Sequence, residues 1–233
     1  MAKNSSALQI AIDGPVAAGK STIAKLLSQK LQLTYIDTGA MYRAVALAAQ
    51  QAGVDWNNGE AVAALAKNLK IRLARPVGDK NDGRTVSVYL GEEDVSWQIR
   101  EIEYGEGASI IGQHQPLRKV LVEMQRQLAN EHDVVMEGRD IGSVVLPKAT
   151  LKIYLTADAN ERVNRKQEKL VEMGLKVTRK EVKADVASRD TREMTRKVDP
   201  LKPTPDAWIL DTTDLNIEEV VAQIVTRVKQ LVE

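Results

Sequence analysis

The clearest chemical signal in the sequence is a glycine-rich segment, AIDGPVAAGKST, at residues 11–22. Gly14, Gly19, Lys20 and Ser21 satisfy the spacing G-x-x-x-x-G-K-[ST]. The glycines let the backbone curl until successive N–H groups converge on phosphate oxygens at a helix start. The lysine adds positive charge toward the β- and γ-phosphates, and the serine hydroxyl can ligate Mg²⁺. The sequence therefore predicts a nucleoside triphosphate site, with these residues in it: Gly14, Pro15, Val16, Ala17, Ala18, Gly19, Lys20, Ser21 and Thr22.

Two further polar segments follow short apolar runs. The segment YIDTGAMYR contributes Thr38, Tyr42 and Arg43, and VVMEGRDIG contributes Glu137 and a neighbouring Arg–Asp pair. In open α/β sheets, ligands bind outside the carboxyl ends of the strands, so these side chains are expected at one edge. Glu137 has the placement of an acid that organises Mg²⁺ through water, with Ser21 as the direct ligand.

A third segment, ASRDTREMTRK at residues 187–197, concentrates arginines. Helical spacing predicts that Arg189, Arg192 and Arg196 share one face, with Arg192 between two like charges. A bound polyphosphate would relieve that repulsion. Without one the segment is expected to be loose, as a closing lid requires.

Part of the same segment has a simpler interpretation. Asp185 with Arg189, and Glu193 with Lys197, are spaced to form i,i+4 pairs on a solvated helix. Arg192 and Arg196 are expected to face each other and have no acid four residues earlier, so this interpretation accounts for neither.

These segments require a frame of strands and helices to position them. Short, mostly apolar runs alternate with longer amphipathic ones, which predicts an α/β fold with a parallel five-stranded sheet covered by helices on both faces. The expected strands are residues 8–13, 33–37, 133–137, 151–155 and 207–211.

The last amphipathic segment illustrates the helical pattern. Asn216 followed by Glu219 resembles a capping box. The apolar stripe expected to face the core consists of Ile217, Val220, Val221, Ile224, Val228 and Leu231.

One region departs from this alternation. NLKIRLA and TVSVYLG alternate apolar and polar residues on either side of the Gly- and Asp-rich RPVGDKNDGR. This pattern is typical of a β-hairpin. Residues from about 55 to 100 are therefore interpreted as an insertion in the α/β core.

Composition excludes several classes of protein. The 233 residues, 43% of them hydrophobic, suffice for one sizeable core. A formal charge of +1 argues against a nucleic-acid coat, and the absence of cysteine excludes disulfides and thiolate metal sites. The opening MAKNSSALQI lacks the apolar stretch of a secretory signal, and no run approaches the roughly 18 apolar residues of a membrane span. We expect a cytoplasmic protein with no membrane or nucleic-acid partner.

The sequence also narrows the use of the triphosphate. It has no N-K-x-D guanine motif and no suitably placed D-x-x-G switch, which argues against a regulatory GTPase. A motor or large ATPase would usually be longer and would carry coupling domains. A small chain with one phosphate loop and extra arginines suggests phosphoryl transfer to a small acceptor.

Taken together, the motifs resemble those of bacterial cytidylate kinases over nearly the whole length. The resemblance rests on IDGPVAAGKST, IDTGAMYR, GEEDVSWQIR, EGRDIGSVVLP, SRDTREMTRKVDPL and ILDTTDLNIEEV. It implies a single phosphate-loop kinase domain that transfers the γ-phosphoryl group of ATP to CMP or dCMP with Mg²⁺. Separately, we expect the protein to be a monomer. The implied parts are a core (about 6–37, 106–165 and 200–233), an acceptor-binding insertion (about 38–105) and a lid (about 166–199).

The resemblance also implies residue roles. The residues expected to act in catalysis are Lys20, Arg139, Arg189 and Arg196. Those expected to bind CMP are Thr38, Tyr42, Arg43, Ser109, Arg118, Arg139, Asp140, Arg189, Glu193 and Arg196. Of these, Ser109, Arg118 and Asp140 are expected to read the cytosine edge. Arg162 and Arg165 are expected to approach ATP from the opposite side.

Three residues depart from the family pattern. Ala17 stands where glycine is common, and alanine is expected to be tolerated if φ is negative there. Glu137 replaces a more usual Asp, and Glu193 stands where an Asp is expected to contact the ribose. Two other functions stay open: another small-molecule kinase, for a uridylate or a carboxylated metabolite, and a non-catalytic nucleotide sensor or nucleic-acid accessory protein.

Overall fold

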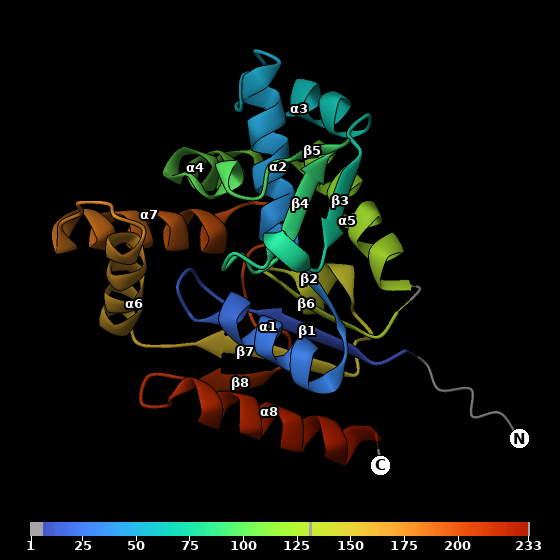
Figure 1. Ribbon diagram of the computed structural model, residues 1–233, viewed down its shortest axis with the longest axis vertical. Coiled ribbons are helices and arrows are strands. Elements are labelled where there is room, and N and C mark those ends of the chain that lie inside the picture. Colours follow the sequence, from blue (N-terminus) through green and yellow to red (C-terminus); the bar gives the residue numbers. More distant parts are fainter. Residues whose placement is uncertain (1–6, 131, 233) are drawn as a thin grey trace, which may run out of the picture.

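Five parallel strands form the central sheet of the protein (Figure 1). The structure, a computed structural model, describes residues 7–130 and 132–232. The predicted core begins at residue 6 and ends at Glu233, and both positions lie outside these ranges. Most of the opening MAKNSSALQI lies outside them as well. The sheet order is β2-β6-β1-β7-β8, and every neighbouring pair is parallel. All five predicted strands are confirmed: β1 (Gln9–Asp13), β2 (Thr34–Asp37), β6 (Val134–Gly138), β7 (Leu151–Thr156) and β8 (Trp208–Asp211).

Helices cover both faces of this sheet, as predicted. On one face, α1 (Lys20–Leu31) and α8 (Ile217–Val232) pack in one apolar cluster with the strands. On the other face, α5 (Gln115–Asn130) and the π-helical turn η3 (Ile141–Val145) pack against β1 and β6. Burial on both faces explains why the strands read as continuous apolar runs.

The predicted cap and stripe of α8 are largely confirmed. The Asn216 amide donates to a Glu219 carboxylate oxygen and the Glu219 amide donates to the Asn216 side chain, both at 2.9 Å. The predicted stripe is wrong at its ends, because Ile217 and Leu231 are about half exposed, whereas Val225 is buried.

The predicted insertion forms a lobe with its own apolar core. Its hairpin is confirmed as antiparallel, with Ile71 opposite Leu90, and a short third strand that the sequence did not indicate joins it. The core of the lobe extends past residue 105 into α4 and α5. The elements of the insertion are α2 (Thr38–Gln51), α3 (Gly59–Ala66), β3 (Ile71–Ala74), η1 (Gly78–Lys80), β4 (Ser87–Leu90), β5 (Glu93–Asp94), η2 (Gln98–Arg100) and α4 (Ile102–Ile111).

Two further helices project from the sheet on the side of α4 (Figure 1). They are α6 (Ala159–Glu172) and α7 (Arg179–Thr195), and a small cluster of valines joins them to Val16 of the glycine-rich segment. α7 lies beside α4 of the insertion (Figure 1). The glycine-rich segment, the insertion and the helical pair therefore surround one space.

No helix among residues 7–130 and 132–232 is long and apolar enough to cross a membrane. The predicted division of the chain into core, insertion and lid stays a prediction.

Candidate functional site

The glycine-rich loop connects β1 directly to α1. Gly14 has φ 152°, and a Cβ on it would lie 2.0 Å from the carbonyl oxygen of Leu155, so only glycine fits. Gly19 caps α1 in the left-handed conformation, with φ 91° and no side-chain cap. The first-turn N–H groups of α1 therefore have no capping side chain and can bind an anion.

Ala17 does not meet the condition under which the sequence led us to expect alanine to be tolerated. Its φ is +60°, in the left-handed region, and not negative. A Cβ in that region approaches the following carbonyl and costs about 1–2 kcal/mol. The loop is held nonetheless, because the Val16 carbonyl accepts a hydrogen bond from Arg162 Nη1 at 3.1 Å. The fold thus retains a strained conformation at the point where the backbone turns around the phosphate position.

Lys20 and its surroundings are buried. The Lys20 ammonium donates to the carbonyl of Pro15 at 2.7 Å, and burial, followed by the charge of Arg139, lowers its pKa to about 7. Asp13 accepts from the amides of Ile141 and Gly142 at 2.7 and 2.8 Å, and burial raises its pKa to about 6. A negatively charged ligand beside Lys20 would favour its protonated form.

An acidic group beside the start of α1 is Glu137, which is 4% exposed. It accepts a hydrogen bond from the Tyr35 hydroxyl at 2.5 Å, and Ser21 lies beside it. Burial, and next the charge of Asp37, raises the pKa of Glu137 above its ordinary value. Ser21 and Glu137, the two residues predicted to serve Mg²⁺, are therefore adjacent. No group of three or more potential metal ligands occurs among the described residues.

A single cavity of about 1280 Å³ brings most of the predicted site together. It runs from the glycine-rich loop to the insertion and to α7. The predicted residues lining it are Val16, Ala17, Ala18, Gly19, Lys20, Ser21, Thr22, Thr38, Tyr42, Arg43, Ser109, Arg118, Glu137, Arg139, Asp140, Arg165, Arg189, Glu193 and Arg196. Gly14, Pro15 and Arg162 are not in its lining.

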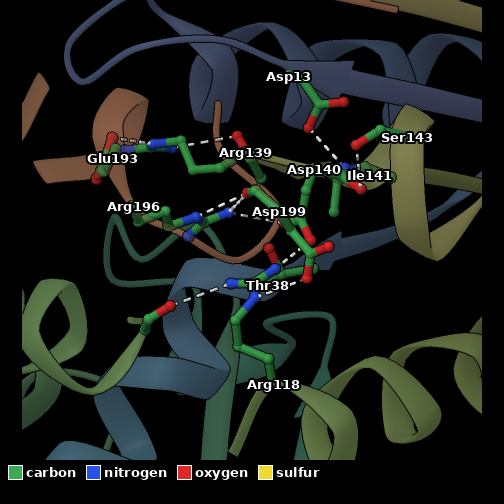
Figure 2. Close-up of polar contacts among 12 residues, drawn as sticks. Asp13, Thr38, Arg118, Arg139, Asp140, Ile141, Ser143, Glu193, Arg196 and Asp199 are labelled. Carbon is green, nitrogen blue, oxygen red and sulfur yellow. Dashed lines mark hydrogen bonds and ion pairs between the residues drawn. The ribbon is translucent and has the colours of Figure 1, made fainter. Parts of the chain in front are cut away.

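One end of the cavity holds a buried charge network (Figure 2). Arg118, 2% exposed, pairs with the carboxylate of Asp140 and donates through Nε to Asp199 at 3.0 Å. Its Nη1 also lies 3.3 Å from the Tyr42 hydroxyl, and burial raises the pKa of Tyr42 to about 12. Asp199 was not predicted as a site residue, although it lies in the quoted segment SRDTREMTRKVDPL. It is held with φ 46° immediately before a proline.

Two hydroxyl groups at the same end differ in their contacts. Ser109 Oγ is buried and has no hydrogen-bond partner among the described residues. Thr38 Oγ1 donates to the carbonyl of Glu137 at 2.7 Å. A buried polar atom without a partner carries a desolvation penalty, so Ser109 is suited to bind a ligand.

A second charge cluster lies between β6 and α7. Arg139 Nε donates to Glu193 at 2.5 Å, and Arg189 Nη2 lies 4.0 Å from the same carboxylate. Burial raises the pKa of Glu193, but the two arginines outweigh it and hold that pKa below its ordinary value. Burial also lowers the pKa of Arg43 to about 10 and lowers that of Arg189. Desolvated guanidinium groups of this kind interact strongly with anions.

The arginine-rich segment forms different pairs from those predicted. α7 ends at Thr195, so Arg196 is beyond the helix and the predicted shared face is wrong for it. It donates instead to the Asp199 carbonyl at 2.7 Å. Asp185 pairs with Lys166 of α6, not with Arg189, because the two helices pack side by side.

Arg192 has an acidic partner that the spacing within its own helix does not predict. Its Nη2 lies 2.7 Å from Glu106 of α4, an acid that is 86 positions away in the sequence. Glu193 likewise pairs with Arg139, not with Lys197. Packing, not helical spacing, supplies these partners.

The two arginines of α6 point in different directions. Arg165 donates to the Thr212 hydroxyl and carbonyl at 2.9 and 2.7 Å, and it lies beside Gly19 in the cavity. Arg162, 7% exposed, faces inward and pairs with Asp190 at 2.7 Å. Its expected contact with ATP stays a prediction.

The protein has a phosphate loop on a parallel sheet, and one cavity joins this loop to a second region lined by arginines. This arrangement is that of a phosphate-loop kinase with a separate acceptor site. The family model described as cytidylate kinase matches residues 10–230 of the chain. The chain therefore belongs to the cytidylate kinase family.

Individual proteins agree with this assignment. The chain is 46% identical over 217 residues to a cytidylate kinase from Exiguobacterium sibiricum, covering 93% of this chain and 95% of that protein. It is 44% identical over 223 residues to a cytidylate kinase from Thermotoga maritima, covering 95% and 97%. A solved structure of an uncharacterized protein from Eubacterium ventriosum shares the fold, with a TM-score of 0.55, 11% identity, and coverage of 95% of this chain and 98% of that one.

Proposed function

We propose that this protein transfers the γ-phosphoryl group of ATP to CMP or dCMP, giving CDP or dCDP and ADP. The observation that carries the proposal is the single cavity that joins the phosphate loop to the network of Arg118 and Asp140. The names of the relatives, all cytidylate kinases, support the choice of acceptor.

On the donor side, the loop and the first turn of α1 would hold the ATP phosphates. Lys20, already inside the cavity, would replace its contact with the Pro15 carbonyl by one with phosphate oxygens. Arg165 would approach from the side of α6, and we retain Arg162 as a predicted ATP residue. The complete proposed ATP set is Gly14, Pro15, Val16, Ala17, Ala18, Gly19, Lys20, Ser21, Thr22, Arg162 and Arg165.

Mg²⁺ fits the residues at the start of α1. Ser21 offers a hydroxyl and Glu137 a carboxylate, which are the hard oxygen donors that Mg²⁺ prefers, and ATP would bring phosphate oxygens. Ser21 would be the direct ligand and Glu137 would act through water. When bound, the ion would neutralise charge on the transferring phosphoryl group.

On the acceptor side, arginines would bind the CMP phosphate and the network would read the base. Cytosine presents an amino donor beside ring-nitrogen and carbonyl acceptors, so a carboxylate and an arginine together distinguish it from uracil. We propose that Ser109, Arg118 and Asp140 make these contacts and that Glu193 faces the ribose. The proposed phosphate ligands are Arg43, Arg139, Arg189 and Arg196, with Thr38 and Tyr42 completing the pocket.

The chemistry requires no general base. An acceptor phosphate has a second pKa near about 6, so it is already an anionic nucleophile at neutral pH. Its oxygen would form a bond to the γ-phosphorus as the bond to the β,γ-bridging oxygen breaks and ADP leaves. Lys20 and the arginines would contribute by holding both phosphates in line and by neutralising charge.

We retain the prediction that the active unit is a monomer. The formal charge of +1 supports small nucleotides, not nucleic acid, as partners, and we propose that the enzyme acts in the cytoplasm without a membrane partner. Salt-sensitive binding to DNA or RNA would contradict the proposed partners.

The direct test is ADP release from Mg·ATP with CMP, dCMP, UMP, AMP or no acceptor. We expect fast turnover with the two cytidine nucleotides alone. Preference for UMP would favour the alternative of a uridylate kinase, and slow release independent of acceptor would leave only a nucleotide-binding ATPase.

A further inference from the structure

We propose that the ion pair between Glu106 of α4 and Arg192 of α7 is a positioning element that joins the acceptor lobe to the lid helix. Arg192 Nη2 and Glu106 Oε1 are 2.7 Å apart, and both residues line the cavity. This inference rests on the proposed phosphorylation of CMP, and it assigns to both residues a role in holding the closed site together.

The pair is the only ion pair between α7 and the lobe of α2, α3 and α4 within residues 7–130 and 132–232. The other ion pairs of α7 stay within the helix or go to α6 and to the end of β6. Breaking it would therefore remove a specific electrostatic link between two lobes that would otherwise meet through packing alone.

The two partners lie one turn away from residues that are proposed to contact CMP. On α4, Glu106 precedes the base-reading Ser109 by three positions, which places the two on the same side of the helix. On α7, Arg192 follows Arg189 by three positions and is adjacent to Glu193. The pair therefore connects the part of the site that reads the base with the part that holds phosphate and ribose.

Charge gives a second reason for the pair. Arg192 lies on a helix that already carries Arg189, and like charges at this spacing oppose each other. Glu106 supplies the neutralising charge that the sequence of α7 lacks at the position four residues earlier. Arg192 Nη1 remains buried without a hydrogen-bond partner among the described residues, so the pair does not use the full donor capacity of the guanidinium.

The expected effect is moderate because the side chains of Glu106 and Arg192 are 41% and 20% exposed. Partly exposed pairs contribute little to stability, so disrupting this one is expected to raise KM for CMP by about two- to fivefold. A looser closure also admits water, so the fraction of ATP lost to hydrolysis should rise in the same variants. Affinity for ATP alone should be unchanged.

The experiment compares Glu106→Gln, Arg192→Gln, the double variant, and the charge swap Glu106→Arg with Arg192→Glu. Steady-state kcat and KM for CMP, CMP affinity by calorimetry, and ATP hydrolysis are measured for each, with thermal unfolding as the check on folding. Asp206→Asn is the matched control, because it breaks a 2.7 Å ion pair with Lys152, and neither residue lines the cavity.

We expect the two single variants to show the same rise in KM for CMP and in ATP hydrolysis. The double variant should show no further rise, and the charge swap should restore both values at least in part. Additive defects, or a defect in Arg192→Gln alone, would overturn it in favour of a direct contact between Arg192 and substrate. Wild-type values for Glu106→Gln would also overturn it. Failure of this proposal can be told apart from failure of the proposed function. If the proposed function were wrong, the wild-type protein itself would neither bind nor phosphorylate CMP.

Discussion

The left-handed conformation of Ala17 leads to an unusual expectation, namely that a mutation to glycine in the phosphate loop stabilises the protein. At φ +60° the Cβ of Ala17 is strained by about 1–2 kcal/mol, which Ala17→Gly removes. Glycine also gains freedom in the unfolded chain, which offsets about 0.4–1 kcal/mol of this gain. The free energy of unfolding should therefore rise by about 0.5–1 kcal/mol, a shift of about 1–4 °C in Tm for a chain of this size.

The assay is urea denaturation of the nucleotide-free protein, followed by circular dichroism, with calorimetry for Tm. Ala18→Gly is the matched control, because Ala18 is 1% exposed and is not among the residues with positive φ. That variant loses packing and adds unfolded-state freedom, so it should be less stable by about 1 kcal/mol. Equal destabilisation in the two variants would refute the left-handed assignment of Ala17.

Three further predictions concern buried charges of the site. Lys20→Ala should lower kcat by at least about 10²–10³ without loss of folding, measured by ADP release and circular dichroism; near-normal turnover would contradict the loop assignment. Arg118→Met should reduce the ratio of kcat/KM for CMP over UMP by about 5- to 150-fold with ATP affinity unchanged, and an unaltered ratio would place base recognition elsewhere. The same change leaves Asp140 buried without its closest partner, so it should also cost about 3–5 kcal/mol of stability. Folding raises the pKa of Asp13 from 3.8 to about 6. Between these two pH values, the Asp13 carboxyl is therefore protonated in the folded protein and ionised in the unfolded protein. Its contribution to stability should therefore fall as pH rises from about 4 to 6, and urea titrations of Asp13→Asn should lack this slope; an identical slope in both proteins would contradict the raised pKa.

In the arginine-rich segment, the charge partners of the arginines come from other parts of the chain. Arg192 looks unpaired along its own helix, yet Glu106 neutralises it from another lobe. Arg139 is similarly paired with Glu193 before any phosphate is present. The carboxylates keep desolvated arginines in place, and an incoming phosphate must compete with them.

The sheet and the phosphate loop could be predicted from the sequence, and 19 of the predicted site residues line the cavity. Five apolar runs became five parallel strands because burial on both faces requires continuous apolar sequence. The loop could be predicted because Gly14, Lys20 and Ser21 act through a short, covalently fixed spacing. The cap of α8 by Asn216 and Glu219 was predictable for the same reason.

Which partner each charged side chain finds depends on how distant parts of the chain pack together. Asp199 reaches Arg118 across 81 positions and Glu106 reaches Arg192 across 86, and no local spacing encodes such pairs. The sign of φ at Ala17 depends likewise on how β7 and α6 pack against the loop. Local patterns set which elements form, whereas pairing across the cavity depends on the packing of elements from the whole chain.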